Sequence, residues 1–248
     1  APWTVAPPAE AQPRGEWWLG FQDPALADLV QRAGSANTSI QQAAGRLAEA
    51  RSLLRSADAA RSVQVGASAG VTLQAGAATT GSATPATLGT AGLNVSYELD
   101  LFGKLSQTSD AARLDADARA ALLQSTRLMV QADVAQTYLQ LRAAQTELQL
   151  VNESLAAYQD TLRLTQRRQQ AGDVAELDVA RVQTEVAATE SEALALQRQQ
   201  ALLTNALAML VGEVPGSFAL PAAAGDAALP VIPPGVPGTV LARRPDVS

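Results

Sequence analysis

The chain has 248 residues, of which 47% are hydrophobic and 17% are charged, enough for one or two domains with a buried core. It contains no cysteine and no histidine, which excludes disulfides, thiolate or histidine-assisted nucleophiles, and zinc sites built from nitrogen and sulfur ligands. A net charge of −6, from 18 Lys and Arg against 24 Asp and Glu, argues against a nucleic-acid partner, because phosphate binding needs a basic surface. There is also no apolar run of the roughly 20 residues that a transmembrane helix requires.

Two capping signals mark a first helical region at residues 23–62, after an extended N-terminal segment at 1–22. Asp23 followed by Pro24 is a favourable N-cap with proline at the first helical position, and Asn37 offers a second cap. The small and apolar residues that follow are spaced three and four apart, which predicts one buried helical face. These residues are Ile40, Ala43, Leu47, Ala50, Leu54 and Ala57.

At Val63 the spacing of apolar residues changes from about 3.6 to 2, which predicts a β-hairpin over residues 63–102 with its tip at 79–85. One face of each predicted strand is apolar without a break, and the other is small or polar. The apolar positions are Val63, Val65, Ala67, Ala69, Val71, Leu73, Ala75 and Ala77, then Ala91, Leu93, Val95, Tyr97, Leu99 and Leu101.

The length and pattern of these strands are typical of outer-membrane barrels, whose strands cross the bilayer in about ten residues. An open sheet edge is not tolerated in lipid, so other strands must then complete the barrel. The alternative is an ordinary half-buried hairpin, although a lone hairpin is only marginally stable in water.

Two acidic residues fall on the polar side of the second predicted strand. Glu98 and Asp100 alternate with Tyr97, Leu99 and Leu101, and in a barrel we expect them to face the lumen, where they would favour cations. Acids on the outer face of a soluble strand would show the same pattern.

A long α-helical hairpin is predicted over residues 103–212, because residues 86–214 contain no proline and the only glycine between 103 and 212 is Gly172. Gly172 suits the left-handed position of a turn at 171–173, and Asp173 with Glu176 resembles a capping box. The apolar repeat of the first helix runs Leu141, Ala144, Leu148, Val151, Leu155, Tyr158 and Leu162. On the second it runs Val179, Val182, Val186, Thr189, Ala193, Leu196, Gln200, Leu203, Leu207 and Leu210.

The predicted fold class is therefore mainly α, a long antiparallel α-helical hairpin with a two-stranded membrane β-hairpin that contributes to an oligomeric β-barrel. A helix of about 100 Å is too long for a globule of this size, so it projects or assembles with copies of itself. The period near 3.5 is that of supercoiled helices.

No catalytic, cofactor-binding or metal-binding residues are predicted, and an enzyme is the least favoured class. Asp110, Asp115 and Asp117 are the nearest approach to an oxygen-ligand cluster. Their helical spacing does not converge as a calcium loop does, and acids near a helix start also suit the helix dipole.

Four stretches together carry a resemblance to a known family. They are YELDLFGK at residues 97–104, the segment 133–186, NALAMLVGEVPG at 205–216 and LARRPDV at 241–247. With these stretches the chain resembles the outer-membrane factor family, the TolC-like efflux channels, and in particular the lipoprotein branch that serves resistance-nodulation-division (RND) pumps. The likeness runs from Trp17 to Val247.

The resemblance implies a protomer of two similar repeats, each with two β-strands and a long helical hairpin. Three such protomers form an outer-membrane β-barrel and a periplasmic α-barrel. On this comparison the chain corresponds to the N-terminal repeat, and residues 213–248 are a Pro-rich equatorial segment and the start of the second repeat. The family's lipid-bearing cysteine would precede Ala1.

The resemblance also implies partners and a location. They are a homotrimer in the outer membrane of a Gram-negative bacterium, in contact with its lipid and with its helices in the periplasm, and a passive path for exported small molecules and drugs. The expected protein partners are a periplasmic adaptor, or membrane fusion protein, and an inner-membrane RND-type pump. No nucleic acid and no cofactor are implied.

In such channels the helical tip contacts the adaptor. The matching positions here are Arg168, Gly172, Leu177 and Asp178. Ala175 stands where a serine is common, and Ala180 stands where a larger apolar residue is common, so the tip departs from the usual pattern at two positions.

Two other functions stay open on sequence grounds. A periplasmic adaptor also has an α-hairpin, but it places β segments on both sides of that hairpin. A trimeric coiled-coil and β-barrel anchor without transport activity has its stalk before its barrel, the reverse of the order here.

Overall fold

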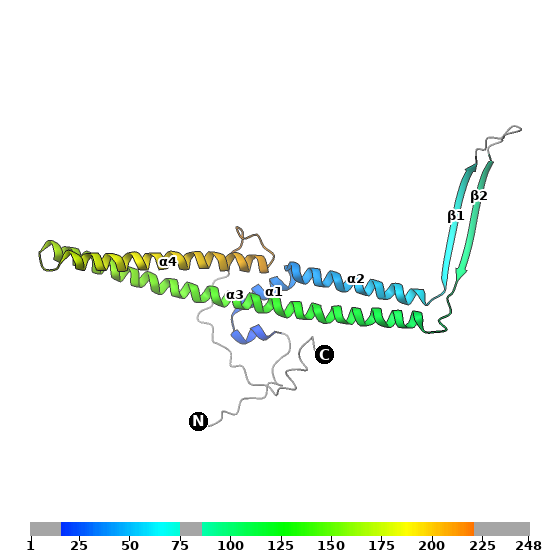
Figure 1. The fold of residues 1–248 in the computed structure, drawn as a ribbon, viewed down its shortest axis with the longest axis horizontal. Helices are drawn as coiled ribbons and strands as arrows, with labels where there is room; N and C mark the ends of the chain where they lie inside the picture. Colours follow the sequence, from blue (N-terminus) through cyan, green and yellow to red (C-terminus); the bar gives the residue numbers. More distant parts are fainter. Residues whose placement is uncertain (1–15, 75–85, 221–248) are drawn as a thin grey trace, which may run out of the picture. The chain divides into compact units, whose positions relative to one another are not determined.

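The computed structural model describes residues 16–74 and 86–220 (Figure 1). The chain divides into two compact units, one formed by Ala1–Ala43 with Leu122–Ser248 and the other by Ala44–Ala121. Three predicted features lie outside the described residues. They are the first 15 residues, the hairpin tip at 79–85, and the Pro-rich stretch from 221 onward with its ARRPDV sequence.

The first unit begins with a short 3₁₀ helix at Trp17–Phe21, so the prediction of an extended segment up to residue 22 is wrong for these five residues. Helix α1 follows at Pro24–Ala36. Asp23 is its N-cap as predicted, because one carboxylate oxygen accepts the amides of Ala25 at 2.9 Å and Leu26 at 3.3 Å.

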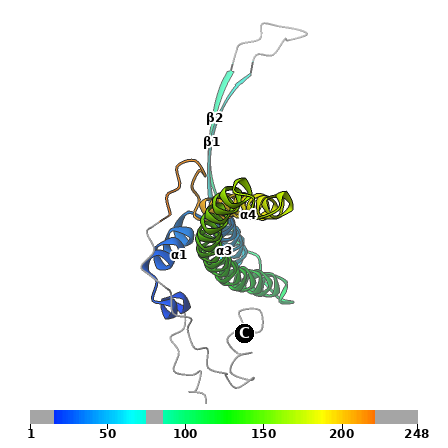
Figure 2. The same cartoon turned by 90° about the vertical axis from the view of Figure 1, so that its left-hand side faces the viewer.

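Helix α1 buries one apolar face completely. Leu26, Leu29 and Ala33 have no exposed surface, which ties this short helix to the rest of the unit. Figure 2 shows α1 beside α3.

Asn37 separates α1 from helix α2, which covers Thr38–Ala60. Its side-chain oxygen accepts the amides of Ser39 and Ile40, which confirms the second predicted cap. The predicted apolar face of α2 is also confirmed, since all six of its residues are buried or half-buried.

The helical hairpin consists of α3 at Lys104–Gln170, with 67 residues, and α4 at Glu176–Leu210, with 35. Helix α4 runs back along the second half of α3 (Figure 1). The Gln200 amide donates to the carbonyl of Ala144 at 2.9 Å across this pair. All ten residues predicted for the inner face of α4 are buried or half-buried, so the predicted repeat of α4 is confirmed. On α3 six of the seven predicted residues are buried or half-buried, and Tyr158 is the exposed exception.

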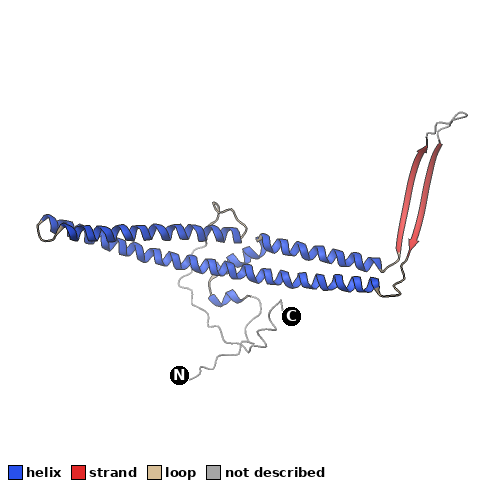
Figure 3. Ribbon diagram, viewed as in Figure 1, coloured by secondary structure: helices blue, strands red, loops and turns tan. Residues whose placement is uncertain are grey.

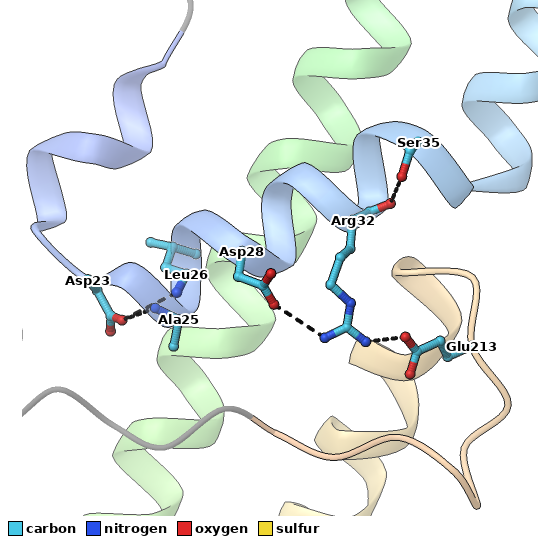
Figure 4. Close-up of polar contacts among 7 residues, drawn as sticks. All are labelled: Asp23, Ala25, Leu26, Asp28, Arg32, Ser35 and Glu213. Carbon is cyan, nitrogen blue, oxygen red and sulfur yellow. Dashed lines mark hydrogen bonds and ion pairs between the residues drawn. The ribbon is translucent and has the colours of Figure 1, made fainter.

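The C-terminal end of α4 is fastened to α1. Gly212 has a φ of 73° and follows the helix in a Schellman arrangement, with the Glu213 amide donating to the carbonyl of Ala208 at 2.8 Å. The Arg32 guanidinium pairs with both Asp28 and Glu213, as Figure 4 shows. The hydrogen bond to Glu213 is the main cause of the raised pKa of Arg32.

The second unit contains the C-terminal part of α2, the β-hairpin and the first part of α3. Strands β1 (Gln64–Gln74) and β2 (Ala86–Ser96) form a two-stranded antiparallel sheet (Figure 3). The Ser109 hydroxyl donates a hydrogen bond to Asp58, which joins α2 to α3 within this unit. The fold class is thus mainly α with a two-stranded hairpin, as predicted.

Candidate functional site

The β-hairpin separates apolar from polar residues over most of its length. The predicted positions Ala75 and Ala77 lie outside the described residues. In the observed register Val65 lies opposite Val95 and Ala67 lies opposite Leu93, so the predicted apolar residues that fall within β1 and β2 share one face. This face is not packed against the unit, and Leu93 is 82% exposed. An exposed apolar face of this length marks a surface that another apolar phase must cover.

The opposite face carries small and polar residues. Gln64 lies opposite Ser96, and Gly66 lies opposite Asn94. The hydroxyl of Thr90 donates to the carbonyl of Gly70 at 3.3 Å, within the hairpin itself. Thr87 and Leu88 break the pattern at the far end of β2, because the threonine lies on the apolar face and the leucine on the polar one.

The predicted second strand is too long at its C-terminal end. Pairing stops at Ser96, so Tyr97, Leu99 and Leu101 follow the strand rather than belonging to it. Glu98 and Asp100 therefore do not lie on a strand face, and the prediction that they do is wrong. Whether either acid faces a lumen stays a prediction.

Asp100 instead accepts hydrogen bonds from the start of α3. Its carboxylate accepts the amides of Leu105 at 3.1 Å and Ser106 at 2.8 Å, and the Ser106 hydroxyl at 2.6 Å. The hydrogen bonds from Ser106 hold the pKa of Asp100 below its ordinary value. The carboxylate thus satisfies amides that a helix start leaves without intrahelical partners.

The tip of the helical hairpin is a Schellman motif with Gly172 at its left-handed position. Gly172 has a φ of 85°. The amide of Asp173 donates to the carbonyl of Arg168 at 2.9 Å, and the amide of Gly172 donates to the carbonyl of Gln169 at 3.0 Å. The predicted role of Gly172 is confirmed.

The cap of α4 differs from the prediction. The helix begins at Glu176 after an N-cap at Ala175, so the predicted box of Asp173 with Glu176 is wrong. Ala175 has no side-chain acceptor, and only the reciprocal half of a box is present: Asp178 accepts the amide of Ala175 at 3.2 Å.

The four predicted adaptor-contact residues all lie around this tip. Arg168, Gly172 and Leu177 are exposed, the last at 60%, and Asp178 is half-buried. Glu98 and Asp100 belong to the other unit. The sequence thus predicts correctly which residues share the tip, and their contact with an adaptor is untested.

One buried polar cluster escaped the sequence analysis. The Tyr138 hydroxyl donates to Asp23 at 2.6 Å and accepts from Arg142 at 3.0 Å, and the Arg142 guanidinium lies 5.0 Å from the Tyr138 ring centre. Burial is the main cause that raises the pKa of Tyr138, and the hydrogen bond to Asp23 adds to it. Extending the apolar repeat back from Leu141 to Tyr138 would have revealed its burial.

Two kinds of feature are absent from the described part of the chain. Within residues 16–74 and 86–220, no helix combines the length and the apolar character needed to cross a bilayer. No three acidic side chains in the same ranges are grouped so that they would hold a metal ion.

Known proteins resemble this chain along almost its whole length. The pyoverdine export outer membrane protein OpmQ of Pseudomonas putida is 32% identical over 256 residues, covering 98% of this chain and 54% of that protein. The toluene efflux pump outer membrane protein TtgF, from another strain of Pseudomonas putida, is 30% identical, covering 93% of this chain and 49% of that protein. The chain spans about half the length of these curated relatives.

The fold is also that of solved channels. The structure of the outer-membrane channel OprN matches with a TM-score of 0.80 at 29% identity, covering 97% of this chain and 55% of that one. The family model for outer membrane efflux proteins matches residues 29–213, which include α2, the β-hairpin, α3 and α4. The chain belongs to the outer membrane efflux protein family.

Proposed function

We propose that this chain is part of an outer-membrane channel subunit of a tripartite efflux pump. The subunit provides a passive, water-filled path for exported small molecules, and the energy comes from an inner-membrane RND-type pump through a periplasmic adaptor. The proposal assigns no catalytic step to the chain.

One observation carries the proposal. A hairpin with an exposed apolar face, on which Leu93 is 82% exposed, leads within eight residues of Ser96 into a helix of 67 residues. Lipid covers an apolar face of this kind in a closed barrel, and the polar, small-residue face then lines the lumen. The names of the relatives, which are outer membrane proteins of export and efflux, agree with this assignment.

A closed barrel requires more strands than the two described here, so we propose that three protomers assemble. The exposed surface of α3 and α4 away from their shared seam combines small and polar residues with large apolar ones such as Leu150, Leu164 and Leu194, which further helices would cover. Helices that pack on two sides form a tube rather than a solitary pair. The tip at Gly172 is then the end that meets the adaptor.

Swelling of liposomes that contain the full-length protein tests the channel function. We expect inserted trimers to admit small neutral solutes and to exclude a large dextran, since the path is a pore of limited width. Trimers that insert but pass no solute would contradict the proposal and favour a structural anchor. A matched liposome preparation with heat-denatured protein controls for leakage.

A further inference from the structure

A hollow lies where helix α2 meets the base of the β-hairpin, within the second unit. Its volume is about 650 Å³, in the range of sites that bind small molecules. Ala59 and Ala60, the last two residues of α2, form one wall, and the start of β1 with the end of β2 forms another. Its polar lining comes from Ser56, Ser62, Gln64, Ser96 and Glu98.

The hollow is continuous with the polar face of the hairpin. Gln64 and Ser96 lie directly opposite each other on that face, and both line the hollow. The proposed function assigns this face to the water-filled lumen, so the hollow then opens onto the path of the exported molecules. A charged group in the hollow then acts on the molecules that pass.

Glu98 is the only charged residue of the hollow, and the hairpin itself has none. No Asp, Glu, Lys or Arg occurs from Ser62 to Tyr97, although 17% of the whole chain is charged. Arg61, the nearest cation in the sequence, does not line the hollow. The hairpin face that leads to Glu98 is therefore neutral, and this carboxylate is the first charge at its base.

The lining is held in place by contacts of its own. The Ser62 hydroxyl donates to the carbonyl of Ala59 at 2.7 Å, and the Gln64 side-chain amide donates to the same carbonyl at 2.5 Å. No ion pair within residues 16–74 and 86–220 involves Glu98. The C-terminal end of a helix also carries a partial negative charge, which favours cations. The hollow thus has negative charge, and none of its lining residues is cationic.

We propose that this hollow binds organic ammonium ions, with the Glu98 carboxylate as their counter-ion. Tyr97 also lines it, and an aromatic ring attracts cations of this kind. The serine hydroxyls accept hydrogen bonds from ammonium N–H groups. The site slows cationic cargo at the base of the hairpin, whereas neutral and anionic cargo passes without binding. This inference rests on the proposed function, since it requires the polar face to line a lumen.

Thiol modification in the membrane-inserted full-length protein measures the charge of the hollow. The chain has no cysteine, so Ser96→Cys places a single thiol in it, and Ser62→Cys is a second position with the same expectation. The rates of a cationic and an anionic methanethiosulfonate reagent are compared, each relative to its rate with free 2-mercaptoethanol. A carboxylate roughly 7 Å away should favour the cationic reagent by about three- to sevenfold, with the larger value at low salt.

Two variants serve as matched controls. Glu98→Gln keeps the size of the side chain and removes its charge, so it should return the ratio of the two rates to that of the free thiol. Ser68→Cys lies on the same face, farther along the neutral strand, and should show the free-thiol ratio with Glu98 in place.

Competition by benzyltrimethylammonium tests binding itself. At a concentration equal to its dissociation constant, this cation should reduce the rate of the cationic reagent at residue 96 by about half, because half of the sites are then occupied. The rate at residue 68 should not change, and Glu98→Gln should abolish the competition. Benzenesulfonate, an anion of similar size, should not compete.

Three results overturn the inference and leave the channel function standing, provided that Ser68→Cys reacts and Leu93→Cys does not. The first is a free-thiol ratio at residue 96, and the second is a raised ratio without competition by benzyltrimethylammonium. The third is no reaction at residue 96 with either reagent, which would mean that the rest of the channel covers the hollow. If Leu93→Cys reacts as fast as Ser68→Cys, the hairpin does not span a membrane, and the proposed function fails together with the site.

Discussion

The side chains of Tyr138 and Asp23 meet although 115 residues separate them in the sequence: the tyrosine hydroxyl donates a hydrogen bond of 2.6 Å to the carboxylate. The other oxygen of that carboxylate caps α1. Asp23 therefore starts one helix and attaches it to the middle of another. This contact and the pairing of Arg32 with Glu213 hold α1 at two points along its length.

Replacement of Tyr138 by phenylalanine tests this attachment. We expect Tyr138→Phe to lower the free energy of unfolding by about 1–3 kcal/mol, because a buried carboxylate oxygen loses its donor. Tyr158→Phe is the matched control, since Tyr158 is 40% exposed, and its effect should stay within about 0.5 kcal/mol. Thermal unfolding of both variants measures the difference, and equal midpoints would show that the contact does not stabilise the protein.

The same tyrosine predicts a dependence on alkaline pH. The pKa of Tyr138 is raised, so its stabilising contribution is complete below the ordinary tyrosine value of 10.0 and is lost as the pH rises through the higher, folded value. The wild-type protein should therefore lose more stability than Tyr138→Phe when the pH is increased above 10. Parallel loss in the two proteins would contradict this origin.

Gly212 meets two requirements that alanine does not. Its φ is 73°, and a Cβ atom there would lie 2.6 Å from the carbonyl oxygen of Ala36. We expect Gly212→Ala to destabilise the protein by at least about 1–2 kcal/mol, from the backbone conformation alone. Gly45→Ala, inside α2 where no atom lies within 4 Å of the new methyl group, should instead stabilise by about 0.5–1 kcal/mol. Chemical unfolding should therefore show a lower free energy of unfolding for Gly212→Ala and a higher one for Gly45→Ala than for the wild type.

The cap of α3 predicts a local effect on the first turn of that helix. The pKa of Asp100 is lowered below the ordinary value of 3.8. Its stabilisation of the start of α3 is therefore complete above pH 3.8 and is lost as the pH falls through the lower, folded pKa. Asp100→Ala should accelerate hydrogen exchange at the amides of Leu105 and Ser106 at neutral pH. Glu98→Ala is the control, and equally fast exchange in that variant would mean that Asp100 is not the cap that matters.

The helical tip is tested by two substitutions at Gly172. We expect Gly172→Val to weaken pull-down of the adaptor, because a β-branched residue does not adopt a φ of 85° readily. Gly172→Asn should retain the turn and the binding, because asparagine tolerates the left-handed conformation. Unchanged pull-down and unchanged efflux with the valine variant would remove the tip from the interface.

Much of this fold follows from periodicity and capping chemistry alone. The ten inner residues of α4 and the six of α2 can be identified because burial repeats with the helical period. Asp23, Asn37 and Gly172 cap or turn the chain through contacts within five residues of themselves, so local sequence is sufficient to assign these roles. The four tip residues, Arg168, Gly172, Leu177 and Asp178, lie together for the same reason, because they are close in the sequence.

The sequence predictions that the structure contradicts failed for physical reasons. Alternation of apolar residues continues past Ser96, but it specifies faces and not hydrogen-bonded pairs. Pairing stops at Ser96, and Asp100 instead accepts hydrogen bonds from the start of α3. The spacing of Asp173 and Glu176 fits a capping box as well as the spacing of Ala175 and Asp178 at the observed helix start does. The partner of Tyr138 lies 115 residues away, and no local pattern contains that distance.

The most direct test of the central claim is a cysteine scan along β1 in the membrane-inserted full-length protein, read out by a water-soluble maleimide. If the proposed function is right, positions 64, 66, 68, 70 and 72 face the lumen, and we predict that they react. Positions 65, 67, 69, 71 and 73 then face lipid, and we predict that they are protected. This alternation of period two follows from the observed register. Uniform reaction at all ten positions would contradict a membrane-spanning hairpin and with it the channel.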